Sequence, residues 1–260
     1  MPDSVTLVRD GSVARVTLNQ PDRRNAFDPE MIAAARATFE GFARDNTLRV
    51  VVLAGAGPVF CGGADVSYMA ASLQMTREQN LDDSLKLAGM MHAINSCPVP
   101  VITRVQGAAL GGGAGACAAS DRVVAADDAA FGFTEVKLGI VPAVISPFVI
   151  AKIGETNARA LFPTGERFDA ARAQRIGLVH DVVPSANLDA AVQAIVEEVL
   201  SAGPTAVRVA KEIALTVGRL APTDVPAWTA RRLANQRTSD EGQEGLRAFL
   251  EKRDPSWRQK

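Results

Sequence analysis

Three runs of mostly aliphatic and β-branched residues constrain the fold of this 260-residue chain more than any other feature. They cover residues 49–53, 101–105 and 123–126, and each is long enough for one strand. Continuous apolar runs of this kind are typical of strands that are buried on both faces of a sheet. Helical patterns at residues 29–44 and 77–94 precede the first run and separate it from the second. Buried strands that alternate with helices predict crossover connections, a largely parallel sheet and an α/β fold.

Local signals predict the ends of several elements. The pair Asp10-Gly11 lies between two stretches of alternating apolar residues, which indicates a β-hairpin over the first eighteen residues. Asp28 is placed to cap the first predicted helix at its N-terminus. Thr238 and Glu241 have the spacing of a capping box at the start of the last predicted helix.

The last third of the chain is expected to be mainly helical, because helix signals recur there with short gaps. The sequence contains no internal repeat of fixed period, so the simplest organisation is one α/β domain followed by a helical region. The predicted helices of this last third cover residues 168–176, 186–200, 204–219, 224–236 and 240–252.

Charge and composition exclude several classes of protein. Lysine and arginine number 28 against 29 acidic residues, so no global basic field exists and we expect no nucleic-acid partner. Cys61, Cys97 and Cys117 lack CxxC spacing, which argues against a disulfide framework and a zinc site and fits a reducing cytosol. The longest uncharged runs, residues 105–119 and 138–151, are too short to span a bilayer. With no signal peptide at its start, the sequence predicts a cytoplasmic protein without a membrane partner.

Hydrolytic enzymes are a weak alternative. The sequence has no GxSxG motif, and neither His92 nor His180 lies near a plausible nucleophile. We expect His92 to be partly buried on a helix and His180 to lie at the edge of a strand. Cys61 is expected to be a small buried thiol that packs in the core.

Two glycine-rich loops each follow a predicted buried strand. They cover residues 60–65 and 110–115, and the second opens a helix of small residues. Gly111, Gly113 and Ala116 match the loose pattern of a dinucleotide-binding turn, but no suitable ribose-binding acid follows. Glycine lets backbone N–H groups approach a ligand oxygen, and two converging N–H groups would form an oxyanion hole. Two tight turns without chemistry are the alternative.

Glu135 is the candidate acid or base. It lies twenty residues after Gly115, at the end of the largely apolar stretch 131–134. Burial of a carboxyl in such surroundings raises its pKa toward neutrality, where it transfers protons efficiently. A solvated surface glutamate is the alternative.

In this order and spacing, these segments resemble those of the crotonase superfamily, the enoyl-CoA hydratases and isomerases. The resemblance covers nearly the whole chain, and its pieces are residues 18–27, 60–65, 106–113, 131–135 and 242–257. It implies an α/β fold in which residues 1–195 form a spiral of β-β-α units. It further implies that residues 196–260 form a helical region through which the chain associates as a homotrimer or a dimer of trimers.

The resemblance also implies the site. The N–H groups of Gly62 and Gly112 would hold the thioester oxygen of an acyl-CoA, and Glu135 would be the acid/base. Neither a metal nor a cofactor is expected, since coenzyme A is part of the substrate. By the same resemblance, CoA and substrate would be bound by Arg23, Arg24, Ala26, Gly63, Ala64, Asp65, Val66, Gly111 and Gly115, with Phe249 or Lys252 from a neighbouring helix closing the site.

The chain departs from the pattern of the family's hydratases, which carry two glutamates, because the first of these falls on Gly115. A single glutamate resembles both the Δ3,Δ2-enoyl-CoA isomerases and the bacterial 3-methylglutaconyl-CoA hydratases of leucine and isoprenoid breakdown. Residues 60–65, 139–143 and 242–253 look closest to the latter. We therefore expect hydration of a branched 2-enoyl-CoA, for which Gly115 should leave room. An isomerase that uses Glu135, or an RNA-binding or non-catalytic homologue, is the alternative.

Overall fold

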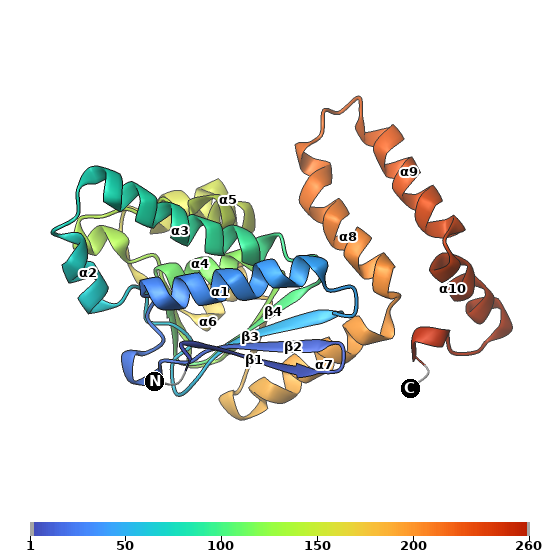
Figure 1. Cartoon of the computed structure of the whole chain (residues 1–260), viewed down its shortest axis with the longest axis horizontal. Coiled ribbons are helices and arrows are strands. Elements are labelled where there is room, and N and C mark those ends of the chain that lie inside the picture. Colours follow the sequence, from blue (N-terminus) through green and yellow to red (C-terminus); the bar gives the residue numbers. More distant parts are fainter. Residues whose placement is uncertain (1–2, 259–260) are drawn as a thin grey trace.

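Two sheets form the centre of the fold, and the computed structural model describes residues 3–258 (Figure 1). The main sheet has the strand order β1-β2-β3-β4-β6-β9, and β1 and β2 form an antiparallel hairpin. From β2 onward all neighbours are parallel. The main-sheet strands are β1 (Val5–Asp10), β2 (Val13–Leu18), β3 (Val50–Gly55), β4 (Val101–Val105), β6 (Arg122–Ala126) and β9 (Asp181–Val183). The small sheet contains β5 (Ala108–Leu110), β7 (Ala130–Gly132) and β8 (Arg167–Asp169).

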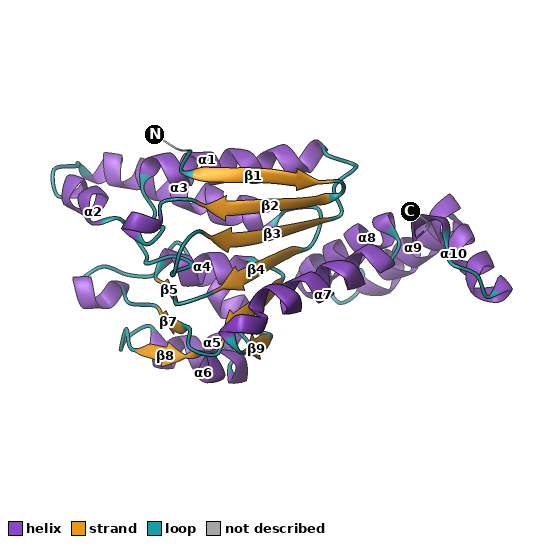
Figure 2. Ribbon diagram, turned by 90° about the horizontal axis from the view of Figure 1, so that it is seen from below, coloured by secondary structure: helices purple, strands orange, loops and turns teal. Residues whose placement is uncertain are grey.

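Helices cover both faces of the main sheet, and the last three extend away from it as an arm (Figures 1 and 2). One face is covered by α1 (Pro29–Gly41) and α3 (Arg77–Asn95), and the other by α7 (Leu188–Ser201). The remaining core helices are α2 (Val66–Ser72), α4 (Gly112–Ala119), α5 (Ser146–Leu161) and α6 (Ala170–Arg175). The arm consists of α8 (Pro204–Thr216), α9 (Val225–Thr238) and α10 (Asp240–Glu251). Within residues 3–258, no helix has the length and apolar character needed to cross a membrane.

The predicted parallel α/β architecture is confirmed. The three apolar runs are β3, β4 and β6, and the side chains of all three are almost entirely buried. The hairpin is also present, but its turn consists of Gly11 and Ser12, one residue later than predicted. Gly11 alone supplies the positive φ angle, at 53°.

Helix α5 was not predicted, because two residues that usually break helices lie in or near it. Pro147 occupies the first turn, where its missing N–H costs nothing. Gly154 has a non-helical backbone with a φ angle of 75°, so α5 consists of two helical segments that meet at a kink. Helix α2 and the three-residue strands were missed as well, since such short elements carry little periodic signal.

The predicted capping box at the last helix is wrong. Thr238 is the final residue of α9, and Ser239 caps α10 by accepting from the Gly242 N–H at 3.0 Å. The Glu241 carboxylate instead accepts from the N–H groups of Thr205 and Ala206, at 2.8 Å each. These donors lie in the first turn of α8, where backbone N–H groups lack partners within the helix. Glu241 therefore joins α10 to the start of the arm.

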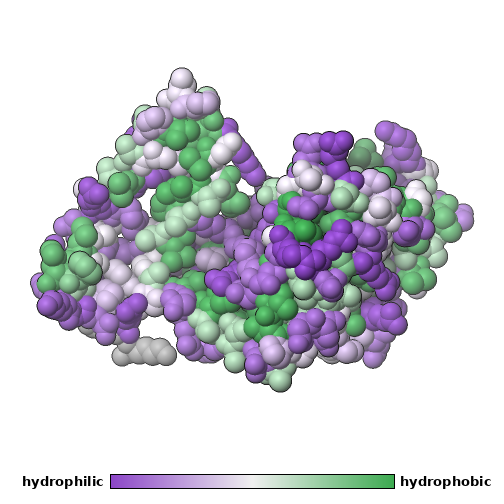
Figure 3. Space-filling model, turned by 180° about the vertical axis from the view of Figure 1, so that it is seen from behind, coloured by the Kyte–Doolittle hydropathy of each residue, from purple (hydrophilic) through white to green (hydrophobic). Residues whose placement is uncertain are grey.

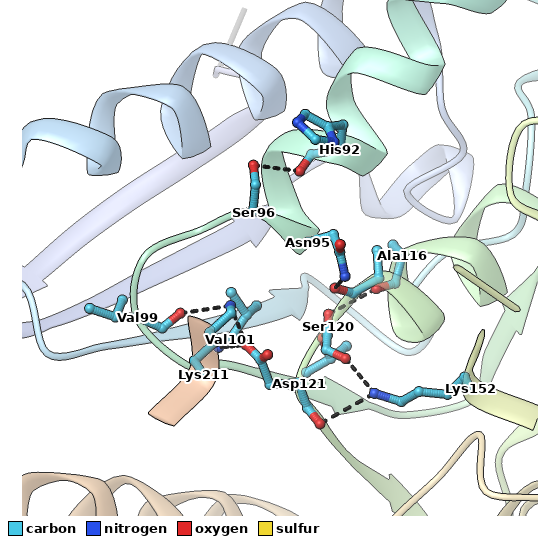
Figure 4. Close-up of polar contacts among 12 residues, drawn as sticks. His92, Asn95, Ser96, Val99, Val101, Ala116, Ser120, Asp121, Lys152 and Lys211 are labelled. Carbon is cyan, nitrogen blue, oxygen red and sulfur yellow. Dashed lines mark hydrogen bonds and ion pairs between the residues drawn. The ribbon is translucent and has the colours of Figure 1, made fainter. Parts of the chain in front are cut away.

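A partly buried ion pair attaches the arm to the core (Figure 4). The side chain of Lys211 on α8 is only 7% exposed, and its Nζ lies 2.6 Å from the Asp121 carboxylate. Lys211 also donates to the Val99 carbonyl at 3.0 Å, and Asp121 accepts from the Val101 N–H at 2.7 Å. Lys152 on α5 donates to the backbone carbonyls of Ser120 and Asp121. The first arm helix is thus held at the point where β4 begins.

We predict that Lys211→Met lowers the free energy of unfolding by about 1.5–3 kcal/mol, because it removes the cation that is hydrogen-bonded to a partly buried carboxylate. Arg159→Met is the matched control, since Arg159 pairs with Glu155 at 3.5 Å on the exposed surface of α5. That change should cost at most about 1 kcal/mol. Urea unfolding at one fixed protein concentration measures both. Equal losses for the two variants would contradict the role given to Lys211.

Candidate active site

The two glycine-rich loops lie side by side. Cys61 and Ala109 form an isolated parallel bridge, and the Leu110 N–H donates to the Cys61 carbonyl at 3.1 Å. A Cβ added to Gly113 would lie 2.7 Å from Cys61 Cβ, so a larger residue does not fit there. Cys61 is fully buried as predicted, and burial raises the pKa of its thiol to about 12. The thiol therefore packs the two loops together, as predicted.

The N–H of Gly62 is already engaged within the protein. It donates to the Arg24 carbonyl at 2.8 Å. The Phe27 N–H then donates to the Gly63 carbonyl at 2.7 Å, and the Asp65 N–H donates to the Phe27 carbonyl at 2.9 Å. Residues 62–65 thus pair with residues 24–27 like neighbouring strands. Because its hydrogen is committed to Arg24, the Gly62 N–H does not fit the role of an oxyanion donor.

Ala64 offers the donor that Gly62 does not. Its bridge to Phe27 uses the carbonyl of Gly63 and the N–H of Asp65, so the Ala64 N–H faces the other way. Gly63 has a φ angle of 108°, which only glycine adopts readily and which turns the chain at this point. Among residues 3–258, no oxygen accepts from the Ala64 N–H.

Gly112 is the first residue of α4, where the prediction placed the second donor. The first N–H groups of a helix have no intrahelical acceptor and lie at the positive end of its dipole. A Cβ at Gly112 would lie 2.9 Å from the ring of Phe27. The backbone therefore turns tightly here, with no space for a side chain.

Glu135 lies beside both loops. Its Oε1 is 3.4 Å from the position that a Cβ on Gly111 would take, and that position is 3.9 Å from Gly63 Cα. Its Oε2 is buried and has no hydrogen-bond partner among the described residues. Burial raises the pKa of this carboxyl above its ordinary value of 4.5. A partly desolvated carboxyl with a raised pKa is suited to proton transfer near neutral pH.

The room expected at Gly115 is filled by Ile145. A Cβ at Gly115 would lie 2.2 Å from Ile145 Cγ2 and 3.4 Å from Met91 Cε. Ile145 itself is 2% exposed and is the residue that precedes α5. The absent glutamate is therefore replaced by an apolar contact between α4 and α5, so the expectation of open space is wrong.

The residues expected to bind CoA mostly lie around the 60–65 loop. The guanidinium of Arg23 is 3.7 Å from the carboxylates of both Asp28 and Asp65, and its side chain is 56% exposed. Asp65 caps α2 by accepting from two N–H groups, at 2.9 and 3.1 Å. Ala26 is buried in the turn beside Arg24, whereas Val66 is exposed at the start of α2.

Phe249 and Lys252 are not near this site. They lie in and just after α10, at the opposite end of the molecule's long axis from α2 (Figure 1). Phe249 is 81% exposed. Because the arm leads α10 away from the core, these residues cannot close the site of their own chain.

The hydrogen bonds of the two histidines are made to residues outside the two glycine-rich loops. His92 is exposed on α3, contrary to the prediction that it is partly buried. His180 precedes the edge strand β9, and its Nδ1 accepts from the Val123 N–H at 3.0 Å. Within residues 3–258 no group of three or more His, Cys, Asp or Glu is placed to hold a metal ion.

Sequence reasoning assigned no role to Asn25 or Ile145. Asn25 is fully buried and bonds to two segments. The only sign of its role in the sequence was that this polar residue directly precedes the apolar pair Ala26-Phe27. Ile145 had no such signal, because nothing in an uncharged run marks the side chain that faces Gly115.

Comparison with known proteins gives the family. A sequence model described as enoyl-CoA hydratase/isomerase matches residues 9–260. A Thermus thermophilus protein named as an enoyl-CoA hydratase is 36% identical over 248 residues, which cover 95% of this chain and 98% of the relative. The chain therefore belongs to the enoyl-CoA hydratase/isomerase family.

Solved structures agree with this assignment. The structure of an enoyl-CoA hydratase from Shewanella pealeana has a TM-score of 0.93 at 38% identity, over 98% of this chain and 96% of the other. Pseudomonas aeruginosa AtuE has a TM-score of 0.95 at 35% identity, over 98% of this chain and all of the other. The crotonase fold expected from the sequence is confirmed.

Proposed function

We propose that this chain adds water across the 2,3 double bond of an enoyl-CoA thioester. The observation that carries the proposal is the Glu135 carboxyl, which lies beside Gly111 and Gly63 and whose buried Oε2 has no hydrogen-bond partner within residues 3–258. Such a group needs a ligand or a water molecule to satisfy it. The family assignment supports a thioester as that ligand.

In the proposed mechanism, the N–H groups of Gly112 and Ala64 bind the thioester oxygen. They stabilise the negative charge that forms on this oxygen when water attacks C3. Glu135 takes a proton from the water, the hydroxyl bonds to C3, and the proton is then delivered to C2. Loss of one such donor in other enzymes costs about 10²–10³ in rate. These steps need no cofactor beyond the CoA of the substrate.

Arg23 and Arg24 are proposed to bind the CoA phosphates. Support comes from the exposed guanidinium of Arg23, which has two carboxylate neighbours only at 3.7 Å. An arginine held this loosely can rotate toward a phosphate and form shorter, paired hydrogen bonds. Ala64, Asp65 and Val66 would then lie along the adenine side of the same loop.

We predict that Glu135→Gln lowers kcat for hydration by about 10²–10⁴, because it removes the base that activates water. In the wild type, kcat/KM should rise with pH through the raised pKa of Glu135, at a pH above 4.5, since only the ionised carboxyl accepts a proton. Steady-state assays with crotonyl-CoA over a range of pH values measure both kcat and kcat/KM. Glu166→Gln is the control, because Glu166 is exposed and pairs with Arg172 at 2.8 Å. Full activity of Glu135→Gln on every enoyl-CoA tested would refute the assignment.

A Δ3,Δ2-enoyl-CoA isomerase is the second candidate. It is favoured by the lone carboxylate, because moving one proton between C2 and C4 needs only Glu135. The two functions separate in the same assay by product: a 3-enoyl-CoA turned over without uptake of water supports the isomerase. Hydroxyacyl-CoA formed from a 2-enoyl-CoA supports the hydratase.

The finer proposal is a branched substrate such as 3-methylglutaconyl-CoA. It is supported by the three sequence segments that resemble that branch of hydratases. A hollow of about 310 Å³ is lined by mainly apolar residues, the first of which, Val136, comes directly after Glu135 in the chain. Since Ile145 fills the space at Gly115, this hollow is the place we propose for the acyl branch. It is lined by Val136, Val141, Pro142, Ala143, Ser146, Phe162 and Pro163.

We predict a higher kcat/KM for 3-methylglutaconyl-CoA than for crotonyl-CoA. Product analysis with a panel of linear and branched thioesters measures it. Ile145→Ala should move the preference further toward branched chains, because it opens the contact with Gly115. A wild-type enzyme that prefers crotonyl-CoA would contradict the branched assignment while leaving the hydratase assignment intact.

We propose that the arm joins copies of this chain into trimers or pairs of trimers. The arm carries large exposed apolar side chains, and green apolar residues are visible along it in Figure 3. They are Leu233, Leu246, Phe249 and Leu250. Phe249 and Lys252 would then close a neighbouring copy's site. Light scattering should give three or six times the chain mass of 27.4 kDa, and a single-chain mass would refute the proposal. The three free cysteines support the cytoplasmic location proposed for this assembly.

A further inference from the structure

Asn25 joins two segments of the site through one buried side chain. It is 0% exposed, and its Oδ1 accepts from the Gln20 N–H at 2.9 Å. Its Nδ2 donates to the Ala56 carbonyl at 2.8 Å and to the Val59 carbonyl at 2.7 Å. Both amide hydrogens are therefore used. The side chain ties residues 20–27 to the loop that follows β3.

The backbone at this point is held in an unfavourable conformation. Arg24 and Asn25 have φ angles of 54° and 51°, in the left-handed region. Asparagine tolerates this region better than most residues, and arginine does not. A Cβ at Gly55 would lie 2.9 Å from Asn25 Nδ2 and 2.3 Å from the Phe60 carbonyl, so the amide fits into a space kept open by glycine. Two successive left-handed residues persist only where surrounding bonds hold them.

These left-handed residues determine where the next rungs of backbone pairing fall. The pairing of residues 24–27 with residues 62–65 begins at the first of them, Arg24, and runs through the three hydrogen bonds described above. The pairing commits the Gly62 N–H to Arg24 and turns the Ala64 N–H away from Phe27. The direction of the Ala64 donor thus depends on the geometry that Asn25 holds.

We propose that Asn25 is a positioning residue whose amide orients the Ala64 N–H toward the thioester oxygen. This inference rests on the proposed function, because it concerns the donor used in that mechanism. Asn25 does not touch the substrate. It acts by fixing the register between residues 24–27 and 62–65, and a donor displaced by about 1 Å can cost 10²-fold in rate.

Two variants separate the amide from the backbone conformation. Asn25→Gly removes the amide but adopts the left-handed conformation freely. Asn25→Asp keeps the shape but points carboxylate oxygens at the carbonyls of Ala56 and Val59. Asn95→Asp is the matched control, because Asn95 also donates to a backbone carbonyl, that of Ala119, at 3.3 Å. Asn95 lies at the end of α3, beside the C-terminal end of α4 (Figure 4).

The readout is the C=O stretching frequency of bound crotonyl-CoA, measured by infrared difference spectroscopy. Each variant is placed on a Glu135→Gln background so that the thioester is not turned over. N–H donors lower this frequency, so the background protein should show a downward shift that both Asn25 variants largely lose. With Glu135 intact, kcat should fall by about 10²-fold. The affinity for free CoA, which has no thioester oxygen, should stay unchanged, as should the frequency shift and the kcat of Asn95→Asp.

The outcomes are distinct. A full frequency shift and full kcat in both Asn25 variants would overturn the inference, even if they melt at lower temperature. An equal loss of kcat in Asn95→Asp would also overturn it, since the effect would then be general destabilisation. No shift in the background protein would instead refute the proposed oxyanion hole itself. If Asn25→Asp does not fold, Asn25→Gly alone decides, because glycine carries no charge into the buried site.

Discussion

The site depends on backbone pairing that lies mostly outside the regular strands. Residues 62–65 pair with residues 24–27, and residue 61 pairs with residue 109. Each backbone N–H committed in this pairing is unavailable to a ligand, and each one left over is a donor. Ala64 is exposed, and no oxygen of residues 3–258 accepts from its N–H, so this donor remains open to an acceptor from a ligand. The proposed oxyanion hole would thus be formed by N–H groups that the pairing of the loops leaves unused.

Glu135 follows from the same packing. The glycines of both loops let the backbone approach its carboxyl, and the apolar residues before it exclude water, which raises its pKa. In the proposed mechanism Glu135 is the only carboxyl, and Ile145 occupies the space beside Gly115 where a second glutamate was expected from the family pattern.

The sequence predicts the strands and the loops, but not which atoms of the loops are free. The runs of β3, β4 and β6 are apolar because both faces of the sheet are covered, and that property is visible in composition. The choice between Gly62 and Ala64 as donor is not visible, because it depends on the bond to Arg24 and on the φ angle of Gly63. The role of Ile145 was not predicted for a similar reason, since it lies thirty residues along the chain from Gly115, against which it packs. The left-handed conformation of Asn25 leaves no periodic signal either.

Helix α4 connects the site to the arm. Gly112 at its N-terminus faces the proposed thioester, while the residues just after its C-terminus bind Lys152 and, through Asp121, Lys211. A cation is favourable at this end of a helix because the dipole is negative there. Burial has the opposite effect on the charge of Lys152, because it lowers the pKa of that side chain. Seven of the eight residues of α4 are buried and all are small, so the helix has little freedom to tilt. The docking of the arm and the direction of the Gly112 donor are thus set by one rigid element.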